Sequence, residues 1–260
     1  MNDPVDNPNL ISGIHNYCDR WCERCQFTSR CAVYAIEEAD PDVNPAARDI
    51  TNEAFWQKLA AIFAETHAMI SAIAEERGID LSEEALEPIR QRKETERDNA
   101  RNHPLGLAAE EYAHAVSQWF EQDSSKQELV SDMLDEVNLE QKADDDEDEF
   151  VAVIRWYQFF IAAKLIRALV SSVDEDDYLV EESGRDSDGS AKAALIGIDR
   201  SISAWRLMYD SRGEHAAQSD MIKKLLLDLE KLRLGAEETF PDARDFIRPG
   251  FDEASLDVLH

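Results

Sequence analysis

The pattern of hydrophobic and polar positions predicts an all-α fold. Apolar residues recur at steps of three and four over long stretches, strand-like alternation is hard to find, and the chain has 8 prolines and 9 glycines. Such steps place apolar side chains on one face of a helix, which then packs against its neighbours. We predict a helical bundle of about five main helices, over roughly residues 51–77, 105–137, 150–170, 191–209 and 214–234.

The predicted helix 51–77 carries the clearest apolar stripe. Its members, three or four residues apart, are Phe55, Leu59, Ile62, Phe63, Thr66, Met69, Ile70 and Ile73. We expect this face to pack inward and Gly78 to end the helix. The charge-dense segment 82–101 is predicted to be an exposed helix or a connector.

The later helices are predicted with less regular patterns. The 105–137 segment is predicted to be one helix, or two if the polar run Asp123-Ser124-Ser125 interrupts it. The 150–170 helix is apolar nearly all round, so neighbouring helices should surround it. The acidic segment 174–190 is predicted to be a loop, and Gly235 is predicted to end the last helix.

Three segments are predicted along the chain. Residues 1–48 form a cysteine-rich, metal-binding segment that includes a short helix near residues 32–38. Residues 49–239 form the helical bundle domain. Residues 240–260 form a C-terminal tail packed on its surface.

The strong excess of negative charge disfavours some classes of binding partner. Asp and Glu number 56 against 27 Lys and Arg, giving a formal charge of −29. Such a field repels phosphate backbones and anionic lipid, so we expect neither nucleic acid nor membrane as a partner. A basic or a redox protein partner remains compatible with this charge.

No targeting or spanning segment is expected. The N-terminus lacks the basic and apolar regions of a secretory signal. The longest apolar stretch, 150–170, contains Arg155, Gln158, Lys164 and Arg167, which are costly in hydrocarbon. We therefore expect a cytoplasmic protein.

All four cysteines lie within fourteen positions, as Cys18, Cys22, Cys25 and Cys31. In a reducing cytoplasm such a group favours metal binding over disulfides, and thiolates select zinc and iron. Zinc ribbons use two separated C-x2-C pairs, whereas one compact loop with short gaps is closer to how ferredoxin-like loops hold a cluster. We predict that the four cysteines bind an iron–sulfur cluster of the [4Fe–4S] type, with zinc as the alternative.

The gaps Cys18-x3-Cys22-x2-Cys25 look like the cluster motif of radical SAM enzymes. The resemblance covers eight residues. That family's motif has three cysteines and follows the first strand of an α/β barrel, whereas this chain has a fourth cysteine nearby and no strand–helix alternation. Membership of the family is therefore not inferred.

Charged and aromatic residues alternate with the cysteines. Arg20, Arg24 and Arg30 outnumber Asp19 and Glu23, and nearby cations lower thiol pKa values. Three aromatic residues either shield the site from water or simply pack the loop onto the bundle, the second being the simpler interpretation, and His15 is a reserve ligand. The aromatic residues are Tyr17, Trp21 and Phe27.

Two further groups were weighed on the helices. Glu111-x-x-His114 matches one element of ferritin-like di-iron proteins, but both side chains should face solvent and no second copy appears. On the 150–170 helix, Arg155 and Lys164 either line an anion pocket or pair with a carboxylate, for which Asp199 is the candidate.

Three functional hypotheses follow. The first is a cytoplasmic helical protein whose cysteine loop binds an iron–sulfur cluster for electron transfer or redox sensing. The second is a non-catalytic scaffold or interaction protein with a structural zinc. The third is a metal-dependent enzyme of ferritin-like architecture. The sequence identifies no substrate, reaction or oligomeric state.

Overall fold

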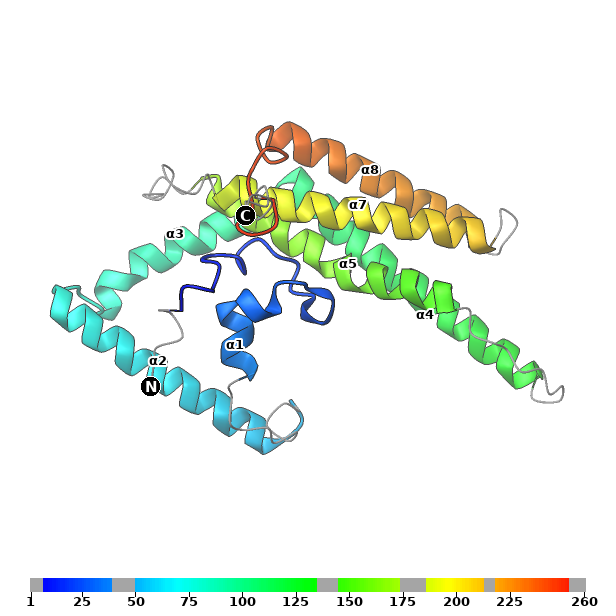
Figure 1. The fold of residues 1–260 in the computed structure, drawn as a ribbon. Coiled ribbons are helices and arrows are strands. Elements are labelled where there is room, and N and C mark those ends of the chain that lie inside the picture. The colour runs from blue at the N-terminus through cyan, green and yellow to red at the C-terminus, as the bar shows by residue number, and fades with distance from the viewer. Residues whose placement is uncertain (1–6, 39–49, 135–144, 174–185, 213–217, 253–260) are drawn as a thin grey trace, which may run out of the picture. The chain divides into compact units, whose positions relative to one another are not determined.

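The structure is a computed structural model that describes residues 7–38, 50–134, 145–173, 186–212 and 218–252. The described residues contain seven α-helices, two short 3₁₀ turns and no strand, which confirms the all-α prediction. The helices are α1 (Ala32–Glu38), α2 (Glu53–Arg77), α3 (Glu83–Asn102), α4 (Pro104–Leu134), α5 (Asp145–Ser171), α7 (Asp186–Arg212) and α8 (Ser219–Thr239) (Figure 1).

The helix count differs from the prediction of about five because α1 and α3 are complete helices beside the five main ones. None of the helices in the described ranges combines the length and the hydropathy needed to cross a membrane.

The contacts divide the chain into two compact units. Unit 1 comprises Met1–Leu10 and Gln26–Thr95, and unit 2 comprises Ile11–Cys25 and Glu96–His260. This division falls inside the cysteine region, between Cys25 and Gln26, whereas the sequence prediction kept residues 1–48 together.

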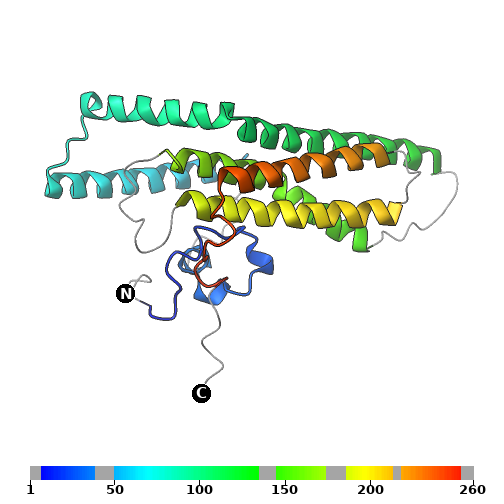
Figure 2. The same cartoon turned by 90° about the horizontal axis from the view of Figure 1, so that it is seen from above.

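Unit 2 is built on a four-helix bundle. Helix α5 packs against α4 and α7, and α8 packs against α7 and α4, so each helix has two neighbours in a closed ring. Consecutive helices run in alternating directions and lie side by side in both views (Figure 1, Figure 2). This is the up-down-up-down arrangement that short connections favour.

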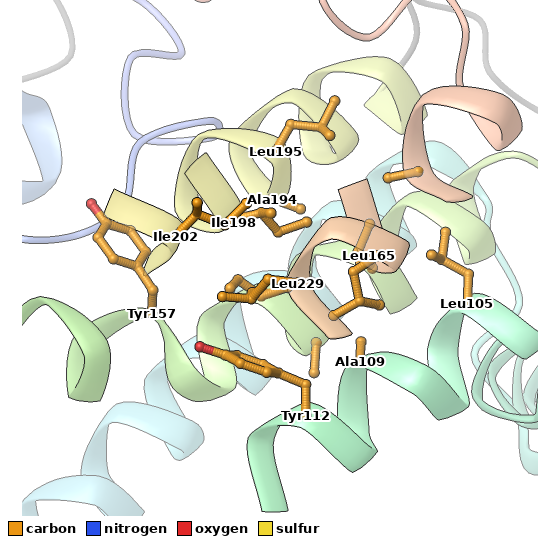
Figure 3. Packing of buried hydrophobic residues seen from close by; sticks show 14 of the residues in the cluster. Leu105, Ala109, Tyr112, Tyr157, Leu165, Ala194, Leu195, Ile198, Ile202 and Leu229 are labelled. Carbon is orange, nitrogen blue, oxygen red and sulfur yellow. The ribbon is translucent and has the colours of Figure 1, made fainter. Parts of the chain in front are cut away.

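Large aromatic side chains occupy the centre of the bundle. Trp119 and Trp205 are fully buried and meet edge to face, with ring centroids 5.0 Å apart. The Trp205 indole N–H donates to the Tyr112 hydroxyl over 3.1 Å, which satisfies a polar group that burial would otherwise leave unpaired. Leucine, isoleucine and alanine side chains of all four helices fill the remaining space (Figure 3).

Two helix ends differ from the prediction. Helix α7 begins at Asp186, inside the segment 174–190 that was expected to be a loop. Helix α8 continues past Gly235 to Thr239. A Cβ at Gly235 would lie 3.2 Å from a Leu105 methyl, so this glycine fits against α4 within the helix. The prediction that Gly235 ends the helix is wrong.

The described part of the C-terminal tail, up to residue 252, packs on unit 2. Phe240, Ala243 and Phe246 are buried. The Lys192 ammonium of α7 donates to the Phe246 carbonyl over 2.6 Å and lies 3.0 Å from the Asp252 carboxylate. These contacts hold the tail against α7.

In unit 1, helix α2 has the ends that the sequence predicts. The Asn52 side chain accepts a hydrogen bond from the Ala54 N–H over 3.0 Å, and Gly78 adopts a left-handed φ of 66° that ends the helix.

The prediction that the apolar face of α2 packs inward is wrong. Most of its large apolar side chains are exposed, including Ile62, Phe63 and Met69. Within unit 1, neither α1 nor the part of α3 up to Thr95 makes an extensive contact with α2. An amphipathic pattern specifies a helix and a face, but it does not specify which element covers that face.

Candidate metal centre

Residues 11–25, here called the docked segment, carry three of the four cysteines and lie on unit 2. Ile14 and Tyr17 are its buried anchors. The Tyr17 ring meets Phe246 edge to face at 4.8 Å, and its hydroxyl donates to Asp186 over 3.2 Å. Gly250, at a φ of 76°, leaves room for Ile11 and Ile14, because a Cβ there would lie 2.9 to 3.0 Å from their methyl carbons.

Asp19 fastens the docked segment to two helices of the bundle. Its Oδ2 accepts hydrogen bonds from the Tyr157 hydroxyl of α5 and from Arg200 Nη1 of α7, each over 2.6 Å. Its backbone carbonyl accepts from the Trp156 indole N–H over 2.9 Å. Burial, reinforced by the hydrogen bond to Asp19, raises the pKa of Tyr157, so the phenol stays a donor at neutral pH.

A stack of aromatic and cationic groups reinforces this attachment. The Trp21 ring stacks on Trp156 with centroids 4.8 Å apart and an interplanar angle of 13°. The Arg24 guanidinium carbon lies 3.8 Å from the centroid of the Trp21 ring. Arg24 also pairs with Glu149, with Nη2 to Oε2 at 2.8 Å. Tyr17 and Trp21 therefore pack the segment onto the bundle, as the simpler interpretation predicts, whereas Phe27 belongs to unit 1.

Cys18 lies within this docked segment beside two cations. Its thiol lies 3.5 Å from the His15 carbonyl, to which it donates. Burial raises the pKa of the Cys18 thiol, while the Arg20 N–H and the charges of Arg20 and Lys164 act in the opposite direction. Arg20, whose backbone N–H interacts with this thiol, has a φ of 59°. Residues other than glycine seldom adopt this left-handed conformation.

Cys22 and Cys25 share one 3₁₀ turn, Cys22–Arg24 with Cys25 as its cap. The Cys25 N–H donates to the Cys22 carbonyl over 3.1 Å. A turn closed in this way holds its first and fourth Cα atoms within about 7 Å. The backbone therefore keeps these two cysteines close to each other.

Cys31 belongs to unit 1. It follows the 3₁₀ turn Thr28–Arg30, and its carbonyl accepts the Ala35 N–H over 3.0 Å at the start of α1. The predicted ligand set is thus divided between the two units, with Cys18, Cys22 and Cys25 in unit 2.

All four cysteine side chains are partly exposed. In the part of the chain that the structure describes, no three His, Cys, Asp or Glu side chains converge closely enough to hold a metal ion. The donor set has the soft-sulfur chemistry that zinc and iron select, but the sulfur atoms are not gathered. His15, the reserve ligand, is partly buried, and burial followed by the charge of Arg20 lowers its pKa.

Lys164 and Arg155 are not brought together. They are nine residues apart on α5, which places them about 180° apart around the helix. Lys164 donates to the Asn16 carbonyl of the docked segment over 3.0 Å, whereas exposed Arg155 lies over the Phe120 ring at 4.1 Å. Of the two, only Lys164 lies beside the cysteines.

Asp199 has a different partner from the one expected. It pairs with Arg244 of the tail, with Oδ2 to Nη1 at 2.6 Å. Arg167, the third cation of α5, pairs instead with Asp186 of α7 at 2.6 Å.

Glu111 and His114 are both exposed on α4, as their positions on the helix predicted. With no group of three metal-binding side chains among the described residues, the ferritin-like hypothesis gains no support.

The sequence analysis missed the residues that attach the segment. It counted Asp19 as a counter-charge and did not single out Tyr157 or Arg200. Asp19 and Arg200 are 181 positions apart, and no local pattern links residues at that separation.

Comparison of the chain with protein-family models, with curated proteins and with solved structures finds no match.

Proposed function

We propose that this chain is a cytoplasmic helical protein that binds an iron–sulfur cluster of the [4Fe–4S] type for electron transfer or redox sensing. Cys18, Cys22, Cys25 and Cys31 are the proposed ligands. The observation that carries the proposal is the attachment of the docked segment through Asp19 and Trp21, since it holds three soft-sulfur donors against the four-helix bundle.

Residues around the cysteines have separate proposed roles. Burial raises the pKa of the Cys18 thiol, and the Arg20 N–H and the charges of Arg20 and Lys164 partly offset this effect. Trp21, stacked between Arg24 and Trp156, covers one side of the segment and limits water there. When bound, a cluster supplies one-electron chemistry whose potential depends on such nearby charges and on solvent access.

A structural zinc is the second candidate, and one observation favours it. Asp19 attaches residues near the N-terminus to α5 and α7, and a structural zinc bound by the cysteines would strengthen the same attachment. In that case the acidic helical body, with its formal charge of −29, is proposed to bind a basic protein partner. Neither candidate involves nucleic acid or membrane.

Elemental analysis after anaerobic purification, with a visible spectrum, tests the proposal. Iron and sulfide in similar amounts, with a band near about 400 nm that bleaches on reduction, support the cluster. Stoichiometric zinc without colour supports the structural site instead.

Single Cys→Ser variants at the four positions locate the ligands. We expect each to lose most of the metal, with Ser29→Ala in the same region as the matched control. Full loading of all four variants contradicts the site, and a preparation with neither metal contradicts both candidates.

A further inference from the structure

The apolar stripe of α2 has the spacing of a coiled-coil seam. Its core positions, separated by four, three, four, three and four residues, are Phe55, Leu59, Ile62, Thr66, Met69 and Ile73. This is the a/d repeat of a heptad, which presents side chains to one facing helix. Trp56, Phe63 and Ile70 follow at every seventh residue beside the seam and widen it. These nine residues are here called the α2 stripe.

The α2 stripe is large enough for a stable contact. Phe63 is 65% exposed and Met69 58% exposed, and Trp56, Ile62, Ile70 and Ile73 are exposed to similar degrees. Together these six side chains leave on the order of 600 Å² of apolar surface per chain, the upper end for a monomer's largest patch. Two such faces in contact reach the roughly 1,200 Å² at which stable interfaces begin.

The charge of α2 selects a second copy as the occupant. The stretch 54–74 contains one cation, Lys58, and one carboxylate, Glu65, and is therefore neutral in a chain of net charge −29. A basic partner would be drawn to the acidic surfaces rather than to this neutral one. Two copies, which repel each other elsewhere, meet here over a long apolar face to which each contributes one carboxylate, Glu65.

We propose that the α2 stripe binds α2 of a second copy in an antiparallel, two-fold symmetric pair. With Phe55 of one copy against Ile73 of the other, Leu59 faces Met69, and Ile62 faces Thr66. The symmetry axis then passes position 64, with Phe63 beside its own counterpart on one side of the seam and Glu65 beside its own on the other. Every large seam residue is covered by the same surface of the partner, as a two-fold contact requires.

The alternative register is weaker. Sliding the helices by one heptad sets Lys58 against Glu65 of the other copy, but it leaves Met69, Ile70 and Ile73 beyond the partner's seam. Exposed ion pairs contribute much less than the burial of three large apolar side chains. The register that covers the whole α2 stripe is therefore favoured. The pair uses none of the cysteines, so it stands apart from the proposed metal.

Sedimentation or light scattering of the full chain tests the pair. We expect a mass of about twice 29.5 kDa for the wild type. Phe63→Glu places two carboxylates at the symmetry axis and should weaken dimerisation at least about 100-fold. Phe159→Glu is the matched control, because Phe159 is a similarly exposed phenylalanine, 57% exposed, on α5. It should leave the mass unchanged.

A charge exchange tests the direction of the helices. Phe55→Lys and Ile73→Glu should each weaken the dimer, and the double variant should recover it at least about tenfold, because opposite charges then face each other in an antiparallel pair. A parallel pair would set like charges together and show no recovery. A monomeric wild type up to about 100 μM, a dimer unaffected by Phe63→Glu, or absence of recovery overturns the proposal.

Discussion

The Tyr17 ring rests directly on the backbone of Gly189. A Cβ built on Gly189 would lie 2.4 Å from Tyr17 Cε1 and 2.7 Å from Phe246 Cζ. Glycine inside a helix costs about 1 kcal/mol relative to alanine. At this position the absence of a side chain leaves the space that the Tyr17 and Phe246 rings occupy.

We expect Gly189→Ala to destabilise the protein although alanine is the better helix former. The added carbon displaces Tyr17 and Phe246, and overpacking of this kind costs about 1–3 kcal/mol. Urea denaturation and limited proteolysis of the docked segment measure the effect. Gly235→Ala is the control, because its Cβ meets only a Leu105 methyl at 3.2 Å. Equal stability of the two variants would contradict the claim that Tyr17 and Phe246 need a glycine at position 189.

Asp19→Asn should release the docked segment. The variant loses the ion pair with Arg200 and weakens the hydrogen bond from Tyr157, at a cost of about 1–2 kcal/mol, given that the Arg200 side chain is about half exposed. Separation of Trp21 from Trp156 should change the tryptophan fluorescence. Asp220→Asn, at a fully exposed position on α8, serves as the control. An unchanged fluorescence spectrum in Asp19→Asn would count against the attachment.

Lys164 and Arg155 permit a matched comparison on one helix. We expect Lys164→Met to lower the amount of bound metal, because it removes both the hydrogen bond to the Asn16 carbonyl and a positive charge near Cys18. Arg155→Met, on the opposite side of α5, should retain the wild-type content. Elemental analysis measures both. The same loss in both variants would indicate a general effect of charge rather than a local one.

The contribution of Asp252 to stability should depend on pH. Burial alone would raise the pKa of Asp252, but hydrogen bonds from Arg248 and Lys192 outweigh it and hold the pKa well below its usual range. A carboxyl with a lowered folded-state pKa stabilises the fold above its unfolded pKa of about 3.9, and this stability is lost as the pH falls through the folded value.

Urea denaturation across the acidic range measures this dependence. We expect Asp252→Asn to be less stable than the wild type by about 1–2 kcal/mol above about pH 5, with the difference shrinking below about pH 4. A difference that stays constant down to the lowest pH would show that the carboxylate charge is not what holds the tail.

The sequence predicted the helices well because helix formation depends on the spacing of apolar residues that are close together in the chain. The heptad pattern from Phe55 to Ile73 and the αL cap at Gly78 both lie within α2 itself. What covers a helix is decided elsewhere in the chain, and for this reason the exposure of α2 was not predicted. The same limit explains Gly189 and Gly235, whose roles depend on Tyr17 and Leu105.

The candidate site was predicted as a set of donors rather than as an arrangement. Cysteine spacing identifies the sulfur atoms, whereas their attachment depends on Asp19 meeting Tyr157 and Arg200, residues 138 and 181 positions away. Charge patterning indicated cations near the cysteines but could not show that Lys164, and not Arg155, is the one that reaches them.

The distance along the chain between Asp19 and Arg200 also sets an order of events during synthesis. The docked segment leaves the ribosome first, but its binding surface requires α7, which is made 181 residues later. At about 5–20 residues per second, the cysteines wait on the order of ten seconds or more before the bundle can receive them. The thiols are thus open to metal or oxidant while the chain is still growing, and any metal delivered in that interval would meet an unattached loop.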